Sequence, residues 1–319
     1  MVSIGLRTAK LGQTGMEITR VGFGAWAIGG GDWEFGWGPQ QDDESVAAID
    51  RALELGVNWI DTAAAYGFGH SERVVARALA GRAERPYVFT KASLLDDGTG
   101  RVVHSLKRDS ILAEAEASLE RLGVDAIDLY QIHWPDPDQD IEEGWSALAE
   151  LKEQGLVRHI GVSNFDVAQL RRISSIAPVE TLQPPFSLVD RSVEGEILPY
   201  AEQAGIGVIV YSPMGSGLLT GGMTAARIAA MPANDWRASD PDFTEPQLSR
   251  HLATAERLAA VGKRYGVSAG AVAVAWTLRN PAVDGAITGF RRADQVAPIV
   301  AAAGLDLTDD DVAEIEAAD

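Results

Sequence analysis

The sequence predicts an α/β protein, a (β/α)8 TIM barrel with an N-terminal β-hairpin and long loops at the C-terminal mouth of the barrel. Strand-like and helix-like patterns alternate eight times with no linker between them, and such alternation favours a parallel sheet. The chain has 319 residues, which fits a barrel of about 250 residues with insertions. Several helical patterns end at a glycine, a common residue at helix C-termini. We therefore expect a single domain over residues 1–319.

The predicted elements follow one another in a regular order. Glycine turns near residues 11–15 indicate a short hairpin, and a strand beginning at Val21 leads into a loop that contains Trp33 and Trp37. Apolar runs rich in β-formers predict further strands over 57–61, 87–91, 127–133, 158–162, 181–183, 206–211 and 285–288. Apolar residues at helical spacing predict helices over 45–55, 71–79, 108–122, 142–154, 167–176, 193–203, 253–265, 269–279 and 292–302. A long insertion with little periodicity occupies residues 212–247.

One glycine pattern does not fit its context. Residues 22–27 read Gly-Phe-Gly-Ala-Trp-Ala, which matches the dinucleotide-binding fingerprint with alanine in the last position. That fingerprint must open a helix, and the three glycines at 29–31 cannot continue one. An open doubly wound sheet is therefore the weaker alternative to the closed barrel.

The composition makes several classes of partner improbable. A net charge of −19 repels nucleic-acid phosphates and anionic membranes, so we expect neither as a partner. The chain has no cysteine, which excludes disulfides, thiolate nucleophiles and Cys-ligated zinc, and we predict no metal site. No stretch approaches ~20 uninterrupted apolar residues, and we expect a cytoplasmic protein. An anionic ligand would need a local cluster of arginines or backbone N–H groups.

Polar residues follow most of the predicted strands. In a parallel barrel the C-terminal ends of the strands converge on one mouth, so these residues are expected to lie close together. Tyr66 joins them because it follows the strand-end residue Asp61 by five positions, in a loop of small residues. The other strand-end residues are Lys91, His133, Ser163, Asn164, Gln183, Tyr211, Gly289 and Arg291.

Each of these residues has a plainer interpretation when it is taken alone. Asp61 could cap a turn, Tyr66 could pack on the surface, and His133 could be a core histidine beside Trp134. Ser163 or Gln183 alone could be a satisfied strand-end polar group. The combination of aspartate, tyrosine, lysine and histidine on three neighbouring strands instead favours a site for proton transfer.

Taken in order, these motifs resemble those of the aldo-keto reductase superfamily, over nearly the whole chain. The resemblance implies reversible carbonyl reduction with a nicotinamide cofactor that is bound extended over the barrel mouth, without a Rossmann domain. The motifs that carry it are Asn58-Trp59-Ile60-Asp61-Thr62-Ala63, Tyr66-Gly67, Lys91, His133-Trp134, Gly161-Val162-Ser163-Asn164-Phe165 and Tyr211-Ser212-Pro213.

The resemblance assigns catalytic roles to four residues. Tyr66 matches the general acid, Lys91 matches the cation that stabilises its phenolate, and Asp61 matches the carboxylate that pairs with Lys91. His133 matches the residue that orients the substrate carbonyl. Because a free phenol has a pKa of about 10, proton transfer near neutral pH needs such a cation.

The resemblance also assigns residues to the cofactor. Ser163, Asn164 and Gln183 match the hydrogen-bond partners of the nicotinamide carboxamide. Tyr211 matches the aromatic residue that stacks on the nicotinamide ring. The other residues expected at the cofactor are Gly24, Ala25, Trp26, Ser212, Pro213, Met214, Gly217, Leu218, Gly289, Arg291 and Gln295.

The part of the sequence expected at the adenosine phosphate departs from the family pattern at two places. Gly222 stands where many members have lysine, and Pro298-Ile299 replaces a common Glu-Asn pair. We nevertheless expect a preference for NADP(H), with Arg291 gripping the 2′-phosphate, while NAD(H) remains open. Arg291 and Arg292 form the adjacent arginine pair that follows a predicted strand at the mouth.

The expected substrate is a small aldehyde, ketone or sugar, or the corresponding alcohol. Trp26, Trp33, Trp37 and Trp134 indicate an aromatic pocket that can stack on a ring or a sugar face. A cofactor-binding regulatory subunit with little turnover is an alternative, and so is an isomerase or aldolase that uses Lys91 as a Schiff base. The physiological substrate, the direction of the reaction and the oligomeric state do not follow from the sequence.

Overall fold

Eight parallel strands close into a barrel in the computed structural model, which describes residues 6–31, 33–232 and 234–317. Neighbouring strands pair in chain order and β12 pairs with β3, which confirms the predicted TIM barrel. The predicted single domain over 1–319 includes residues outside the described ranges and stays a prediction. The strands of the barrel are β3 (Val21–Gly24), β4 (Trp59–Asp61), β5 (Tyr87–Ala92), β8 (Ile127–Ile132), β9 (Val157–Ser163), β10 (Thr181–Gln183), β11 (Gly207–Val210) and β12 (Gly285–Gly289).

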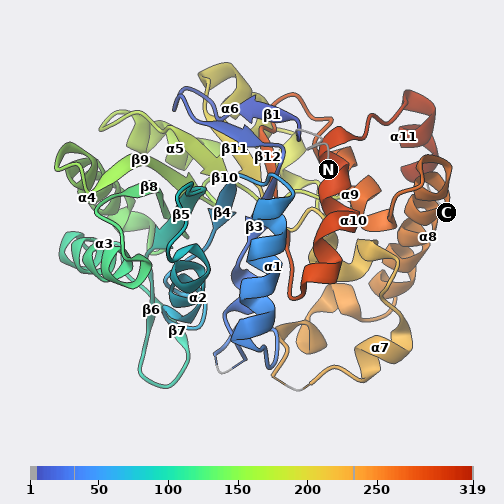
Figure 1. The fold of residues 1–319 in the computed structure, drawn as a ribbon. Coiled ribbons are helices and arrows are strands. Elements are labelled where there is room, and N and C mark those ends of the chain that lie inside the picture. The colour runs from blue at the N-terminus through green and yellow to red at the C-terminus, as the bar shows by residue number, and fades with distance from the viewer. Residues whose placement is uncertain (1–5, 32, 233, 318–319) are drawn as a thin grey trace.

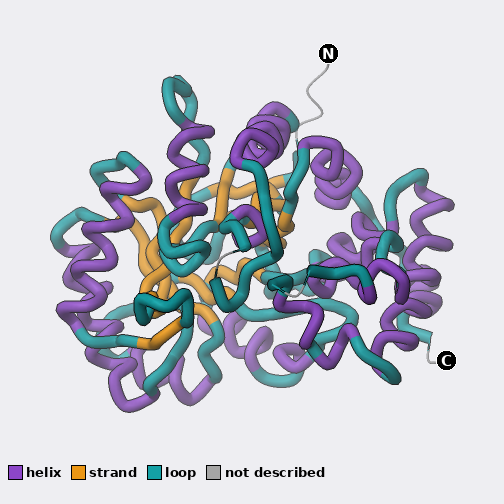
Figure 2. Tube along the Cα trace, turned by 90° about the horizontal axis from the view of Figure 1, so that it is seen from below, coloured by secondary structure: helices purple, strands orange, loops and turns teal. Residues whose placement is uncertain are grey.

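Helices cover the outside of this barrel (Figure 1), and the view in Figure 2 shows the strands gathered within them. Their apolar faces and the outward strand residues form one large core, in which Trp145 and Leu148 of α4 are buried. The main helices are α1 (Asp42–Glu54), α2 (His70–Leu79), α3 (Arg108–Leu122), α4 (Ile141–Glu153), α5 (Val167–Ser174), α6 (Ile197–Ala204), α8 (Gln247–Tyr265), α9 (Ala269–Thr277) and α10 (Val296–Val300). Within the described ranges, no helix combines the length and the apolar character needed to cross a lipid bilayer.

The predicted N-terminal hairpin closes the end of the barrel opposite the mouth. Strands β1 (Thr8–Lys10) and β2 (Glu17–Thr19) pair antiparallel. The buried side chains Leu11, Met16 and Ile18 pack against Trp59 and Phe89 inside the barrel. Figure 1 shows this hairpin at the top, with β6, β7 and α7 at the opposite end.

The interior of the barrel changes from apolar to polar toward the mouth. Side chains on a strand alternate between its two faces, so every second residue points inward. On three neighbouring strands the successive inward positions are Trp59 and Asp61, Phe89 and Lys91, and Leu129 and Gln131. The apolar layer supports a layer of buried polar groups, and this layer forms the floor of the mouth.

Two predicted helices begin later or break into shorter pieces. The predicted helix over 193–203 contains a 3-10 turn at Ser192–Glu194 and becomes α-helical only in α6. The predicted helix over 292–302 is a 3-10 turn, α10 and a second 3-10 turn. Pro199 and Pro298 explain both changes, since proline lacks an N–H and is accommodated within the first turn of a helix.

Other elements lie in segments where no element was expected. The loop after β5 contains a two-stranded hairpin of β6 (Leu94–Asp96) and β7 (Val102–His104). The insertion contains the short helix α7 (Ala225–Ala229), and the C-terminal region contains α11 (Asp309–Ile315). These elements are short, so their periodicity is too weak to distinguish them from loops.

A buried carboxyl group holds the start of the β6–β7 hairpin. Ser93, which has a φ of 90°, donates its backbone N–H to Glu114 Oε2 at 3.0 Å. Ser110 donates to the other oxygen at 3.2 Å, while Glu72 and Arg121 lie near enough to act on the group electrostatically. Burial raises the pKa of Glu114 to about 7. The native protein therefore binds a proton at Glu114 more tightly than the unfolded chain does.

We expect Glu114 to make the stability depend on pH. Because the pKa of Glu114 is raised in the folded protein, the carboxyl group contributes its full stabilisation below the unfolded pKa of about 4.5. This contribution to the free energy of unfolding is lost as the pH rises through about 7. The decrease in the free energy of unfolding between pH 5 and pH 8, measured with urea, should therefore be smaller in Glu114→Gln by up to about 3 kcal/mol. Glu116→Gln, an exposed neighbour on α3, is the control. An unchanged pH dependence in Glu114→Gln would contradict the prediction.

Candidate active site

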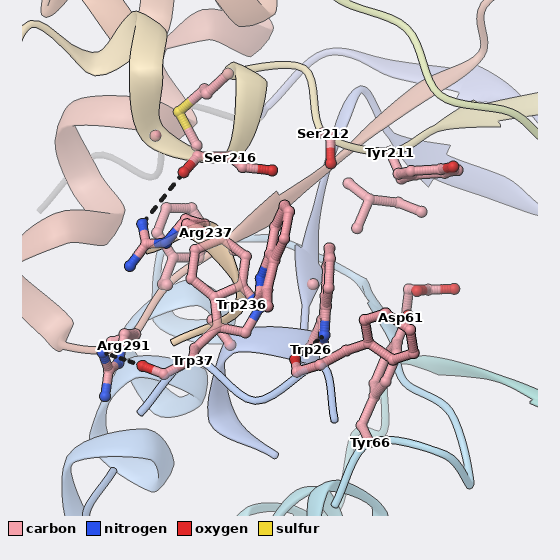
Figure 3. Close-up of a pocket in the computed structure, with 18 of the residues that line it drawn as sticks. Trp26, Trp37, Asp61, Tyr66, Tyr211, Ser212, Ser216, Trp236, Arg237 and Arg291 are labelled. Carbon is pink, nitrogen blue, oxygen red and sulfur yellow. Dashed lines mark hydrogen bonds between the residues drawn. The ribbon is translucent and has the colours of Figure 1, made fainter. Parts of the chain in front are cut away.

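A cavity of about 1190 Å3 occupies the mouth of the barrel. Its floor is formed by the ends of the strands, and its walls come from the loops that follow them. Such a volume exceeds that of a typical small-molecule pocket of about 300–1,000 Å3, so the cavity has room for more than one ligand. Figure 3 shows the side chains of this region.

A buried ion pair lies at the floor of the cavity. Lys91 Nζ donates to Asp61 Oδ2 at 2.6 Å and to the carbonyl oxygen of Thr62 at 2.9 Å. Burial raises the pKa of Asp61 and lowers that of Lys91, and each partner opposes the shift of the other. The ammonium group does not line the cavity, so it acts through its neighbours and is poorly placed to form a Schiff base with a substrate.

The Tyr66 hydroxyl is the next group toward the cavity. Lys91 Nζ lies 3.4 Å from Tyr66 Oη, and Tyr66 lines the cavity with only 8% of its surface exposed. Burial raises the pKa of Tyr66 well above 10, and the negative charge of Asp61 adds to this shift. The expected stabilisation of a phenolate by Lys91 is thus outweighed by burial. Tyr66 is a neutral phenol that can donate a proton.

His133 faces Tyr66 across the cavity floor. The two ring centroids are 5.6 Å apart at an interplanar angle of 78°. Burial lowers the pKa of His133 well below 6.5, and the charge of Lys91 lowers it further. The imidazole is therefore neutral, and its Nδ1 has no hydrogen-bond partner among the described residues. A neutral imidazole beside a phenol can share a hydrogen bond with a substrate oxygen.

Four polar residues form a connected group on the adjacent strand ends. Tyr211 donates its hydroxyl to Asn164 Oδ1 at 2.8 Å, and Asn164 Nδ2 donates to Ser163 Oγ at 3.0 Å. Gln183 Nε2 donates to Asp61 Oδ1 at 2.9 Å, so its amide N–H supports the carboxylate while its carbonyl oxygen remains for a ligand. These residues all line the cavity, together with the catalytic candidates Asp61, Tyr66 and His133.

Unusual backbone conformations gather at the same end of the barrel. Asn164, Ser212 and Ser216 have φ values of 66°, 54° and 51°, in the left-handed region that non-glycine residues rarely adopt. All three line the cavity. Strained backbone of this kind clusters at functional sites, where the surrounding structure holds it.

Two loops meet above the cavity through aromatic side chains, which we call the tryptophan roof (Trp26, Trp37 and Trp236). Trp26 and Trp236 stack with ring centroids 5.3 Å apart and an interplanar angle of 15°, and Trp37 packs edge-on against both. Trp26 lies between Trp236 and Tyr66 in Figure 3. The guanidinium of Arg237 lies 4.3 Å from the Trp37 ring centroid and pairs with Asp235. The roof therefore joins the insertion to the loop after β3.

Arg291, which is predicted at the 2′-phosphate of the cofactor, donates hydrogen bonds to several acceptors of the protein. Its Nε donates to Gln40 Oε1 at 2.8 Å and its Nη1 to the carbonyl oxygen of Trp37 at 3.0 Å, and Nη2 donates to the carbonyl oxygen of Pro39. The guanidinium thus holds the segment 37–40 to the end of β12. Gln295 Oε1 accepts the backbone N–H groups of residues 291 and 292, which removes them as donors to an anion.

Comparison of the chain with known proteins identifies its family. A model of the Aldo/keto reductase family matches residues 20–319. The chain belongs to the aldo-keto reductase family. Enzymes of this family are oxidoreductases that use nicotinamide cofactors.

Named relatives cover nearly all of this aldo-keto reductase. It is 38% identical over 309 residues to Aldo-keto reductase YhdN of Bacillus subtilis (strain 168), covering 96% of this chain and 91% of that protein. It is 33% identical over 320 residues to the NADH-specific methylglyoxal reductase of Escherichia coli (strain K12), with 96% of each covered. A solved structure of a glycerol dehydrogenase from Gluconobacter oxydans has a TM-score of 0.85 at 38% identity, covering 99% of this chain and 95% of that chain.

Most of the residues predicted at the site of this aldo-keto reductase line its cavity, but a few do not. Ala25 is fully buried and its carbonyl oxygen accepts the Ser71 hydroxyl, while Leu218 packs in a separate apolar cluster with Phe243. The predicted residues that line the cavity are Gly24, Trp26, Trp33, Trp37, Asp61, Tyr66, His133, Trp134, Ser163, Asn164, Gln183, Tyr211, Ser212, Pro213, Met214, Gly217, Gly289, Arg291 and Gln295.

Sequence reasoning missed other residues of the cavity wall. Trp236 and Arg237 belong to the insertion, which has no periodicity to indicate where its side chains point. Phe35 and His104 line the end of the cavity near Trp134 and come from the loop after β3 and from β7. For Trp236 and Arg237, the adjacent tryptophan and arginine could have indicated a binding surface. For Phe35 and His104, nothing in the sequence indicated a place in the cavity.

Proposed function

We propose that the protein is an NADP(H)-dependent reductase that interconverts an aldehyde, ketone or sugar carbonyl and the alcohol, with Tyr66 as the general acid and base. The observation that carries this proposal is the contact of Tyr66 with the Lys91–Asp61 pair at the floor of the cavity, opposite His133. A buried neutral phenol beside a neutral imidazole is suited to protonate an oxygen as negative charge develops on it.

Each residue of the site has a separate role in the proposed reaction. The bound nicotinamide supplies or accepts the hydride. Tyr66 Oη donates its proton to the substrate oxygen in the direction of reduction and takes it back in oxidation, while His133 orients that oxygen. The positive charge of Lys91 stabilises the negative charge on Tyr66 Oη once the proton has left, and Asp61 holds Lys91 in place. Tyr66 and His133 therefore contact substrate, whereas Lys91 and Asp61 act through Tyr66.

The polar group beside this floor fits the nicotinamide end of a cofactor. The side-chain carbonyl of Gln183, Ser163 Oγ and Asn164 Oδ1 offer acceptors at one strand end, and the Tyr211 ring lies next to them. Such a set suits the N–H groups of an amide attached to an aromatic ring. The substrate then lies toward Trp26, Trp33 and the exposed Trp134, an aromatic wall suited to a ring or a sugar face.

The names of two relatives define the substrates to test first. One relative is a methylglyoxal reductase and another a glycerol dehydrogenase, so small carbonyl compounds and polyols should be compared in both directions. Turnover is read from the absorbance of NADPH and NADH. Saturable cofactor binding by fluorescence without turnover on any compound would favour the regulatory alternative.

The preference for NADP(H) needs a cation that is free to meet a 2′-phosphate. The geometry favours Arg292 over Arg291, because three of the five N–H groups of Arg291 already donate to residues 37–40. Arg292 lines the cavity, its side chain is 53% exposed, and the side chain of its partner Asp294 is 71% exposed. A phosphate can replace such an exposed partner, because exposed ion pairs contribute only about 0–1 kcal/mol.

We expect Arg292→Ala to raise KM for NADP⁺ about tenfold and to leave KM for NAD⁺ nearly unchanged, the effect of one lost charge-assisted contact. The matched variant Arg291→Ala should instead raise KM for both cofactors, because segment 37–40 loses its anchor. Steady-state kinetics with each cofactor decides between them. A wild type that prefers NAD⁺, or equal effects of Arg292→Ala on both cofactors, would refute the assignment.

A further inference from the structure

An amide and a hydroxyl group are buried inside the barrel without a hydrogen bond to any described residue. Gln131 on β8 is fully buried, and neither Nε2 nor Oε1 makes a hydrogen bond of good geometry, although the amide lies close enough to Asp61 to lower the pKa of that carboxyl. Thr181 on β10 is fully buried too, and its Oγ1 has none. A buried polar atom that lacks a hydrogen bond costs about 1–3 kcal/mol, so three such atoms in one region require a partner.

The register of the barrel brings these groups together. Gln131 pairs with Gly161 of β9, and Gly161 pairs with Thr181 of β10, so all three lie at one level. A Cβ atom on Gly161 would lie 1.9 Å from Thr181 Oγ1, which means that the hydroxyl occupies the space that a side chain there would fill. The hydroxyl thus leans toward β9, the strand between β10 and β8, and neighbouring strands lie about 4.8 Å apart. A water molecule beside Gly161 can reach polar groups from both β8 and β10 with hydrogen bonds of about 2.8 Å.

The two groups lie in the polar layer that holds the ion pair. Lys91 pairs with Gln131 on the neighbouring strand, and Gln183 lies two residues beyond Thr181, one layer closer to the mouth. Burial raises the pKa of Asp61, whereas Lys91, Gln183 and Gln131 lower it. On the other side lies the apolar layer of Phe89 and Leu129, which offers no hydrogen bonds. The polar region is thus enclosed between the ion pair and the core.

We propose that a water molecule is bound inside the barrel between Gln131 and Thr181 and fixes the Gln131 amide beside Asp61. The water donates one hydrogen to Gln131 Oε1 and shares a hydrogen bond with Thr181 Oγ1. The amide N–H then points toward the carboxylate and supports its ionised form, which Lys91 needs as its partner. Gln131 is therefore a positioning residue. Its effect on turnover rests on the proposed function, but the water site itself does not.

A crystal structure at about 1.5 Å resolution tests the water site without reference to activity. We expect density for a water within hydrogen-bond distance of the Gln131 amide and the Thr181 hydroxyl in the wild type. The water should be lost or displaced in Thr181→Val, which keeps the shape of the side chain and removes the hydroxyl. Thr181→Ser is the control and should retain it. A dry site, with Gln131 Oε1 and Thr181 Oγ1 hydrogen-bonded directly to protein atoms, would overturn the proposal.

The pH dependence of kcat tests the role of Gln131. Loss of the amide N–H in Gln131→Leu should raise the pKa of Asp61, so the acid limb should move up by about one pH unit while cofactor binding is unchanged. Thr181→Val should move the limb in the same direction and less far, and Thr181→Ser should restore the wild-type profile. A lower Tm with an unmoved acid limb would show a merely structural role. A wild type without turnover would refute the proposed function and leave the crystallographic test intact.

Discussion

Tyr66→Phe should reduce kcat at least about 100-fold and leave the affinity for the cofactor nearly unchanged. The substitution removes a single oxygen that contacts Lys91 Nζ, and general acids contribute about 10²- to 10⁴-fold to turnover. The ring itself packs with Trp33 and Ala63, and phenylalanine preserves that packing. Single-turnover kinetics and a fluorescence titration with NADPH measure the two effects separately.

A second tyrosine provides the control for this substitution. Tyr200 lies on α6, outside the cavity, with Arg171 over its ring at 5.3 Å. Tyr200→Phe should leave kcat at the wild-type value. If the Tyr66→Phe variant kept wild-type turnover, the phenol would have no part in the reaction, and the proton would have to come from His133.

Lys91→Met should abolish turnover without unfolding the protein. The ammonium is fully buried and holds Asp61, the Thr62 carbonyl and Tyr66 in one geometry, so its loss disorders the acid. Breaking a buried ion pair by removing one partner costs about 3–5 kcal/mol. Because burial already raises the pKa of Asp61, its carboxyl can take up a proton, and this limits the cost. Thermal unfolding and kcat together measure the outcome.

The double variant Lys91→Met with Asp61→Asn separates the structural from the catalytic effect. Removal of both charges should recover most of the lost Tm and none of the activity. Lys107→Met breaks an exposed pair with Asp140 and should change neither quantity appreciably. A collapse of Tm in Lys91→Met that the double variant does not recover would make Lys91 a structural residue first.

The barrel and its floor could be predicted because both follow from local patterns. The alternation of strands and helices determines the fold, and the last inward residue of each strand must reach the mouth. Asp61, Lys91 and His133 therefore come together in the structure as they were grouped from the sequence. Helix α3 has the predicted bounds, since Gly123 takes the positive φ of 63° that ends a helix.

The walls of the cavity could not be predicted because they depend on contacts between distant segments. Trp236 is positioned by the stacking of its ring on Trp26 and by a hydrogen bond from its backbone N–H to the carbonyl oxygen of Gly36, some 200 positions away in the chain. The sequence around Arg291 gives no indication of its hydrogen bonds to the carbonyl oxygens of Trp37 and Pro39, about 250 positions earlier in the chain. No pattern within either segment encodes the conformation of the other.

The tryptophan roof has an energetic consequence for the exchange of a long ligand beneath it. Arg291 anchors one side of the roof, and the Arg237–Asp235 pair with the Ser216 carbonyl anchors the other, so each loop keeps its own shape. Separating the two sides breaks an indole stack, a cation–π contact and one or two hydrogen bonds, about 2–5 kcal/mol in all.

That free energy keeps an open form at between roughly one molecule in thirty and one in several thousand. We expect a dinucleotide bound as proposed to enter and leave without the disordering of either loop, and the opening step to set an upper limit on the rate of exchange. In a stopped-flow record, indole emission would show this step as a phase whose rate levels off as the cofactor concentration rises.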